Sequence, residues 1–212
     1  MSINKQTLDN IFNTDLKLKI IRLFTSRRED YTANGREVAR KTGFTAPAAH
    51  TALKDLYSQD ILKLNIIGKQ HLYSLNFDNR IVKEILIPAF TKELSLKEDI
   101  SQFIKDLIFR LNIADKISSV YLYGSFVREK SNNINDVDIA IVVKDDSEIN
   151  QIEKIFREKI SNDFYNYFGA HLDVYIKSKE EFIRRIREEL PPVSGLIKSH
   201  MVVYGKDITE LK

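Results

Sequence analysis

Residues 121–143 read YLYGSFVREKSNNINDVDIAIVV. An apolar segment ends at Gly124-Ser125. After ten intervening residues, Asp136-Val137-Asp138 opens a second apolar segment, which is rich in β-branched residues and typical of a buried strand. Successive strand residues point to opposite faces of a sheet, so Asp136 and Asp138 should share one face while Val137 points into the core. The pattern predicts two strands with an acidic pair at the start of the second.

This acidic pair needs a chemical reason. Two carboxylates a few ångströms apart repel each other unless a cation lies between them. Oxygen ligands that leave coordination positions open suit Mg²⁺ bound to nucleotide phosphates. Gly124 permits a sharp turn after its strand, and Ser125 should stand at the start of a short helix over residues 126–130. Free backbone amides at a helix start bind phosphate, and the serine hydroxyl adds a donor.

A third acid, Asp173, lies inside the apolar stretch LDVYI at residues 172–176. A charge within a strand of this kind is costly unless it has a function, so Asp173 is a candidate third carboxylate for a second metal or for proton transfer. His171 should face the same side as Asp173. It could contact a substrate, although a partly buried structural histidine is the simpler interpretation.

Composition excludes several classes of protein. The 212 residues are 43% hydrophobic and 30% charged, with a formal net charge of +3, which is typical of a globular protein. Cysteine is absent, so disulfides, thiolate zinc sites and cysteine nucleophiles are excluded. No apolar run is long enough to span a membrane, and the first residues lack the apolar core of a signal peptide. We therefore expect a cytoplasmic protein without a membrane partner.

The chain divides by charge and by pattern into two parts. Residues 1–80 carry 13 basic and 8 acidic residues, whereas residues 81–212 carry 20 basic and 22 acidic residues. We expect a small domain over 1–78, a helical connector over 79–112 and a second domain over 113–212. Pro88 should break the connector into two helices.

The front part reads as helix, helix, glycine turn, helix and hairpin, with the hairpin turn at Gly68-Lys69. This order, over residues 16–75, resembles the winged helix-turn-helix family, which implies binding of duplex DNA and a homodimer. The third helix would present Thr45, Thr51 and Lys54 to the major groove, and Lys69 would reach phosphate from the wing. Winged helices also serve as protein-docking or dimerisation modules, and that alternative stays open.

The back part resembles the DNA polymerase β-like nucleotidyltransferase superfamily, in particular its minimal nucleotidyltransferase branch, on the Gly-Ser, ten residues, Asp-x-Asp signature and the later Asp173. The resemblance implies an α+β fold, with a palm-like domain whose mixed sheet is flanked by helices. It also implies that Gly124 and Ser125 hold a triphosphate, with Arg128 also kept from the family pattern. Asp136, Asp138 and Asp173 would bind Mg²⁺ and perform catalysis.

Two positions depart from that family pattern, in which Arg128 would be followed by glycine and Asp136 preceded by serine. Here the residues are Glu129 and Asn135. Neither changes the acids, so we expect an intact site.

The resemblance implies an enzyme that transfers a nucleoside monophosphate from an NTP, with ATP as the expected donor. In the antitoxin branch the acceptor is a protein, so we expect a HEPN-type ribonuclease toxin, adenylylated on a tyrosine, as a separate partner. Two alternatives remain: a transcription regulator whose nucleotidyltransferase fold only senses nucleotide, and an antibiotic-modifying nucleotidyltransferase. The front domain argues against the latter, because modification of a small drug does not require it.

Overall fold

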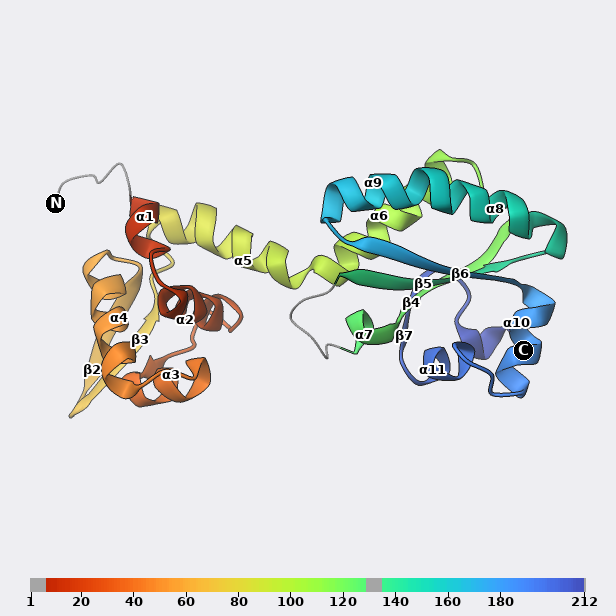
Figure 1. The fold of residues 1–212 in the computed structure, drawn as a ribbon. Coiled ribbons are helices and arrows are strands. Elements are labelled where there is room, and N and C mark those ends of the chain that lie inside the picture. The colour runs from red at the N-terminus through yellow and green to blue at the C-terminus, as the bar shows by residue number, and fades with distance from the viewer. Residues whose placement is uncertain (1–6, 129–134, 212) are drawn as a thin grey trace. The chain divides into compact units, whose positions relative to one another are not determined.

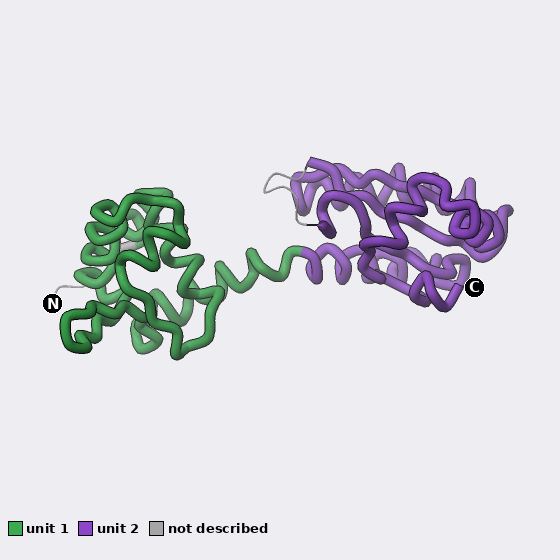
Figure 2. The backbone as a smooth tube through the Cα atoms, turned by 90° about the horizontal axis from the view of Figure 1, so that it is seen from below, with its two compact units in different colours: residues 1–96 green, residues 97–212 purple. Residues whose placement is uncertain are grey.

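The computed structural model describes residues 7–128 and 135–211, which form two compact units, Met1–Leu96 and Lys97–Lys212 (Figure 2). Figure 1 shows helices and strands in both, so the fold is α+β. No helix in the described ranges combines the length and the apolarity needed to cross a bilayer. Each unit has a hydrophobic core of its own.

The first unit has the element order of a winged helix. Its elements are α1 (Thr7–Ile11), α2 (Asp15–Thr25), β1 (Ala33–Asn34), α3 (Gly35–Thr42), α4 (Ala46–Ser58), β2 (Leu62–Ile67), β3 (Gln70–Leu75), a π-helical turn η1 (Val82–Leu86) and α5 (Ile87–Leu94). The strands form an antiparallel sheet in the order β1-β3-β2, in which β2 and β3 are the wing.

Local capping explains where these helices begin and end. The Asn34 side chain accepts a hydrogen bond from the Glu37 amide at the start of α3, and Gly43 ends that helix in the left-handed conformation. Thr45 caps α4 by accepting from the Ala48 amide, as its position in the sequence predicts. The hairpin around residues 68 and 69 is confirmed as well.

The helical connector divides at Ser95, between α5 and α6 (Leu96–Arg110), and not at Pro88. Pro88 lies in the first turn of α5, directly after the π turn η1. Helical backbone runs from η1 into α5 without a break, and the wider π turn, in which the Ile87 N–H donates to the Val82 carbonyl, accommodates the proline. The proline rule therefore predicted two helices correctly but put their boundary in the wrong place.

The second unit is built around a four-stranded mixed sheet in the order β6-β5-β4-β7. Its further elements are β4 (Ile117–Tyr123), α7 (Gly124–Val127), β5 (Asp136–Val143), η2 (Asp146–Glu148), α8 (Ile149–Ile155), η3 (Phe156–Ile160), α9 (Ser161–Phe168), β6 (His171–Ser178), α10 (Lys179–Arg187), α11 (Val193–Lys198), β7 (His200–Gly205) and η4 (Ile208–Glu210). β4 is antiparallel to β5 and β7, whereas β5 and β6 are parallel and are joined by the α8–α9 crossover.

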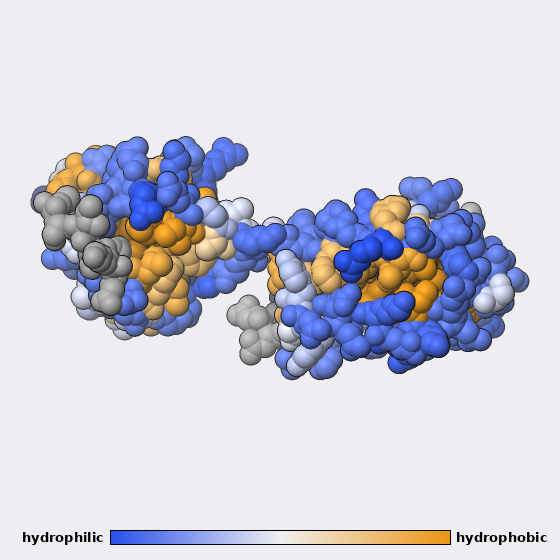
Figure 3. Space-filling model, turned by 90° about the horizontal axis from the view of Figure 1, so that it is seen from above, coloured by the Kyte–Doolittle hydropathy of each residue, from blue (hydrophilic) through white to orange (hydrophobic). Residues whose placement is uncertain are grey.

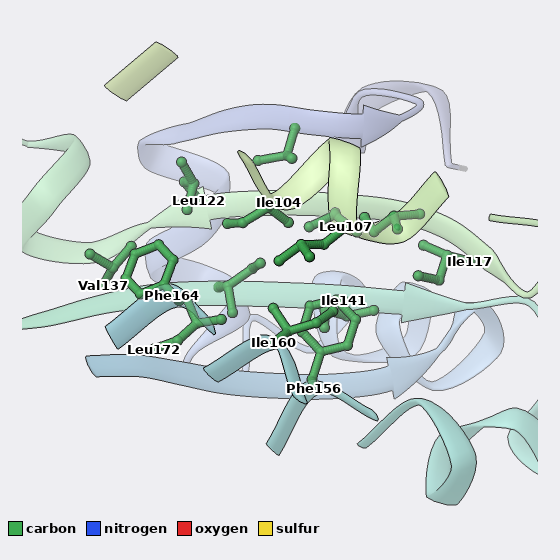
Figure 4. Close-up of a cluster of buried hydrophobic side chains, with 14 of the residues drawn as sticks. Ile104, Leu107, Ile117, Leu122, Val137, Ile141, Phe156, Ile160, Phe164 and Leu172 are labelled. Carbon is green, nitrogen blue, oxygen red and sulfur yellow. The ribbon is translucent and has the colours of Figure 1, made fainter. Parts of the chain in front are cut away.

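Helices cover both faces of this sheet (Figure 1). On one face, α6 and the α8–α9 segment pack against alternate strand residues; Figure 4 shows Ile104 and Leu107 from α6 meeting Phe156, Ile160 and Phe164. On the other face, α10 and α11 pack on Ala140 and Val142 of β5. Seen from above, hydrophilic residues surround limited hydrophobic areas on each unit (Figure 3).

Among the glycines, Gly205 makes the closest approach to another part of the backbone. Its φ is +80°, and a Cβ there would lie 2.0 Å from the Ser118 carbonyl oxygen. Gly205→Ala should therefore add left-handed strain and a backbone clash and destabilise the protein by about 3 kcal/mol. Gly169→Ala is the matched control, because Gly169 has a similar φ of +69° with open space around it. It should cost only about 1 kcal/mol. Urea unfolding followed by circular dichroism measures both, and equal losses would contradict the close contact.

Candidate active site

The three candidate acids come together at one end of the sheet of the second unit. Asp138 on β5 is the register partner of Asp173 on β6, and Asp136 lies opposite His171. Register partners in a parallel sheet point to the same face, and so do residues two positions apart on one strand. All three carboxylates therefore lie on the face that α10 and α11 cover further along the strands.

The turn from β4 into α7 brings the backbone against one of these acids. Gly124 has a φ of +78°, and a Cβ on it would lie 1.8 Å from Oδ2 and 2.7 Å from Cγ of Asp138. Only glycine leaves room for the carboxylate there. The helix that follows begins at Gly124, two residues earlier than the sequence predicted. Asp138 is thus held between the Gly124 turn and Asp173.

These side chains line one open cavity of about 740 Å³. Its lining consists of Ser125, Asn135, Asp136, Asp138, His171, Leu172 and Asp173. Ser125, at the start of α7, is exposed to this space. The structure therefore brings together four of the residues that the sequence singled out, and Gly124 shapes the cavity from behind through its contact with Asp138.

Electrostatics in the cavity favour a cation. Burial raises the pKa of the Asp138 carboxyl, and the nearby carboxylates of Asp173 and Asp136 raise this pKa further. The guanidinium of Arg128 acts in the opposite direction, so its charge lies within reach of Asp138. Burial raises the pKa of the neighbouring Tyr123 hydroxyl as well, with the Asp138 and Asp173 charges adding to the effect. A bound cation would relieve the repulsion that these shifts reflect.

The donor set fits an open Mg²⁺ site and not a closed one. In the part of the chain that the structure describes, no three His, Asp or Glu side chains form a ready-made metal cage. The carboxylates of Asp136, Asp138 and Asp173 nevertheless face one cavity with room for further oxygen ligands. Mg²⁺ is commonly bound by one or two carboxylates together with substrate phosphates, which matches this arrangement.

Arg128 and Asn135 flank a segment that lies outside the described residues. Arg128 is exposed directly after α7, and its backbone N–H donates to the Gly124 carbonyl at 3.3 Å. Asn135 lines the cavity, and its carbonyl accepts from the His171 amide at 2.8 Å. Glu129, which replaces the glycine of the family pattern, is among the residues not described.

His171 is the cavity residue that the sequence undervalued. The simpler interpretation, a partly buried structural histidine, is wrong, because His171 is exposed and lines the cavity. Its ring stacks on Tyr165, with centroids 4.8 Å apart and an interplanar angle of 25°. β6 begins at His171 on the edge of the sheet, so no further strand covers it in the described ranges. Because His171 lies two residues before Asp173, the sequence predicted on which face of the sheet its side chain lies. The sequence did not predict that this side chain is exposed.

In the first unit the predicted DNA-facing residues are all exposed, but they do not form one cluster. Thr51 lies on the side of α4 that faces α2, in a cavity shared with Asp15 and Asp55. Lys69 lines a separate groove of about 500 Å³ with Asn34, Gly35, Arg36, Ala46, His50, Gln70 and His71. The Thr45 hydroxyl oxygen is engaged by the Ala48 amide, whereas Lys54 forms no ion pair with another described residue.

Comparison with solved structures gives low-identity matches. HlyU from Vibrio cholerae is 15% identical, covering 38% of this chain and 80% of that one, with a TM-score of 0.32. A homodimeric winged helix-turn-helix DNA-binding domain from Mycobacterium bovis is 14% identical, covering 47% and 92%, with a TM-score of 0.32. A toxin-antitoxin structure with AMP-PNP is 16% identical, covering 52% and 77%, with a TM-score of 0.33. At such scores these likenesses carry no argument about function.

Comparison with protein families is more informative. No curated protein matches the chain significantly. Residues 90–189, however, match the family model described as Polymerase beta, Nucleotidyltransferase. The matched range contains the Gly124 turn and all three acids of the cavity. Residues 90–189 are therefore similar to the nucleotidyltransferase domain of the polymerase β family.

Proposed function

We propose that this protein is a Mg²⁺-dependent nucleotidyltransferase that moves AMP from ATP to a hydroxyl group of a protein acceptor. The observation that carries the proposal is the convergence of Asp136, Asp138 and Asp173 with Ser125 on one cavity, above the turn at Gly124. Structural acids rarely gather where they raise the pKa of a neighbouring carboxyl, as Asp173 and Asp136 do for Asp138 in addition to its burial.

Each residue has a role in this proposal that follows from its position. Asp136 and Asp138 hold the metal, which when bound offsets phosphate charge and aligns the α-phosphorus. The hydroxyl of Ser125 and the amides at the start of α7 bind the β- and γ-phosphates, with Arg128 beside them. Asp173 accepts the proton of the attacking hydroxyl.

The position of the cavity supports a macromolecular acceptor. Asp173 and His171 lie on β6, which is an edge strand of the sheet. A residue that protrudes from another protein can reach an edge strand, whereas a small-molecule enzyme usually encloses its acceptor. By the resemblance stated above, the acceptor is a tyrosine of a HEPN-type toxin, for which this chain would be the antitoxin.

Two other functions remain as alternatives, and labelling separates them. An antibiotic-modifying enzyme would put the label from ATP on a small molecule. A regulator that only senses nucleotide would bind ATP and label nothing. The proposed enzyme puts the label on protein.

Asp138→Asn should lower AMP transfer by about a thousandfold or more, because it removes a metal ligand of the transition state. The folded protein without metal should be no less stable, since the substitution removes a charge that its neighbours disfavour. Incubation with ATP labelled at the α-phosphate and a co-expressed partner, followed by mass spectrometry for added AMP, measures transfer.

Asp146→Asn is the matched control, because Asp146 is an exposed acid of the same unit that does not line the cavity. The Asp146→Asn protein should transfer AMP at the rate of the unmodified protein. A chelator of divalent cations should stop transfer by both of these proteins. Full activity in the Asp138→Asn protein would rule out the mechanism.

Asp173→Asn should separate binding from turnover. If Asp173 receives the proton of the acceptor hydroxyl, the variant should bind ATP within a few-fold of the unmodified protein while its turnover falls by about 100-fold or more. Equilibrium binding of a non-hydrolysable ATP analogue measures the affinity, and single-turnover transfer measures the rate of the chemical step. A loss of ATP affinity as large as the loss of turnover would instead assign Asp173 to nucleotide binding alone.

For the first unit we propose binding of duplex DNA, as a homodimer. The groove between α3, α4 and the wing supports this, because Arg36 and Lys69 line it together with two histidines and without an acidic residue. In a winged helix, basic side chains in this region contact the phosphates of DNA. Docking of a protein on the same unit is the alternative function.

Lys69→Ala should weaken DNA binding several-fold for every sequence, because a wing lysine contacts phosphate. The slope of log affinity against log salt concentration should become shallower by about 0.9.

Lys54→Ala should instead weaken binding in a sequence-dependent way, since Lys54 lies on the third helix of the motif. Lys105→Ala removes the same charge from α6 of the other unit and is the control. Fluorescence anisotropy against salt measures these effects, and a full-length dimer with no salt-sensitive affinity would favour protein docking.

A further inference from the structure

We propose that the second unit has another nucleotide site, in a cavity separate from the one that Asp136, Asp138 and Asp173 line. This second cavity, called the basic cavity below, has a volume of about 700 Å³ and lies between Lys144 and one side of α10. Its ligand is a nucleoside di- or triphosphate held by its phosphate groups. The proposal goes beyond the proposed AMP transfer, because it assigns nucleotide binding to residues that take no part in that reaction.

The basic cavity lies at the opposite end of the sheet from the acids. Asp136 is the first residue of β5, and Lys144 directly follows the last residue, Val143. The 8 residues of this strand span about 26 Å, at roughly 3.3 Å per residue. Figure 1 shows α10 at the end of the sheet away from α7. A nucleotide held at the acids therefore leaves the basic cavity open.

Three cations of this cavity are available to an anionic ligand. Lys144, Lys179 and Arg187 line the cavity and are exposed, and none of them pairs with an acid in the described ranges. Arg184, which also lines it, is by contrast held by the Glu181 carboxylate at 2.8 Å. Lysine and arginine side chains form charge-assisted hydrogen bonds to phosphate oxygens. The free cations therefore favour a phosphate-bearing ligand.

The spacing of residues along α10 brings this lining to one side of the helix. Lys179, Ile183 and Arg187 recur every fourth residue, and all three line the cavity. Residues four apart are neighbours on a helix surface. Lys179 and Arg187 are separated by about 12 Å along the helix axis, at 1.5 Å per residue. This separation favours a ligand with several phosphate groups over a single phosphate ion.

The rest of the lining favours a nucleotide over an inorganic polyphosphate. Ile183 is partly buried and offers an apolar surface against which a base can lie. The Glu180 carboxylate, which has no cation partner among the described residues, can accept hydrogen bonds from ribose hydroxyls or from an amino group of a base. Inorganic polyphosphate has no such donors at neutral pH and would only be repelled by this carboxylate.

The size and charge of the basic cavity also favour a nucleotide over a nucleic acid strand. Its volume of about 700 Å³ lies in the range that is typical of small-molecule sites, roughly 300–1,000 Å³. A second acid of the lining, Glu188, lies 3.8 Å from the Arg184 guanidinium. The successive phosphates of an RNA strand that follows α10 would pass both Glu180 and Glu188, whose charges repel phosphate.

A chelator separates the two cavities, because the proposed transfer site holds its nucleotide through a metal and the basic cavity needs none. Equilibrium dialysis of the full-length protein with radiolabelled ADP and excess EDTA should show one saturable site per chain. Lys144→Ala and Arg187→Ala should each weaken this binding by about tenfold, since each removes a charge-assisted contact to phosphate. Unlabelled pyrophosphate should displace ADP only at a concentration about tenfold or more above that of unlabelled ADP.

Lys105→Ala is the matched control, because Lys105 is an exposed cation of the same unit that does not line the basic cavity. It should bind ADP in EDTA like the unmodified protein. With Mg²⁺ present, the Lys144→Ala and Arg187→Ala proteins should still bind a non-hydrolysable ATP analogue at the acids, since neither residue lines that cavity.

No saturable ADP binding in EDTA, or binding that neither variant weakens, would overturn the basic cavity as a nucleotide site. Pyrophosphate that competes as well as ADP would overturn it too, and so would a short single-stranded RNA that binds more tightly than ADP. None of these results touches the proposed AMP transfer, which is measured with Mg²⁺ at the other end of the sheet. ADP binding as expected, without any transfer of AMP, would contradict the proposed function alone.

Discussion

The parallel pairing of β5 with β6 is the constraint on which the candidate site depends. It sets Asp138 directly beside Asp173, although 35 positions of sequence and the α8–α9 crossover separate the two acids. The pairing is held by the hydrophobic layer on the opposite side of the same strands, where Val137, Ile139 and Leu172 are buried under the helices. Because successive side chains of a strand point to opposite faces, burial of the apolar residues on one face puts the acids together on the other face. A shift of one residue in either strand would put its acids into the hydrophobic layer, so the core itself enforces the register of the site.

Gly124 adds a second constraint that acts at closer range. The approach of its Cα to the Asp138 carboxylate leaves no space for a side chain, so backbone geometry and a catalytic candidate are fixed together. The cost of crowding appears in the raised pKa of Asp138, which reflects burial and two neighbouring negative charges. Natural proteins accept such unfavourable electrostatics mainly where a ligand restores the balance. Within residues 97–212, the crowded carboxylates and the tight turn at Gly124 therefore coincide in one place.

The acids and the glycine were predictable from sequence because their signals are local: an alternating pattern, a glycine between two periodic segments and a charge within an apolar strand. The cap at Thr45 belongs to the same class of signal, and so does the hairpin at Gly68. The exposure of His171 was not predictable, since it depends on the order of strands in the sheet, which puts β6 at an edge. Tyr165 meets His171 only because the turn at Gly169 folds the end of α9 back over the start of β6. The boundary at Ser95 escaped prediction because the π turn before Pro88 lets the helical backbone continue past it.

The strand order also separates the region that would bind the donor phosphates from the region that the acceptor would approach. On the proposed assignment, the phosphates of the donor contact the turn after β4, and the acceptor approaches across β6. The phosphate side is built from backbone amides, Gly124 and Ser125, whose geometry admits little variation. The acceptor side is built from exposed side chains on an edge strand, which can change without disturbing the core. A fold of this kind can keep the transfer chemistry constant while it exchanges one acceptor for another. The described residues that line the cavity all lie within residues 97–212, so on the proposed assignment the winged helix can serve a separate partner.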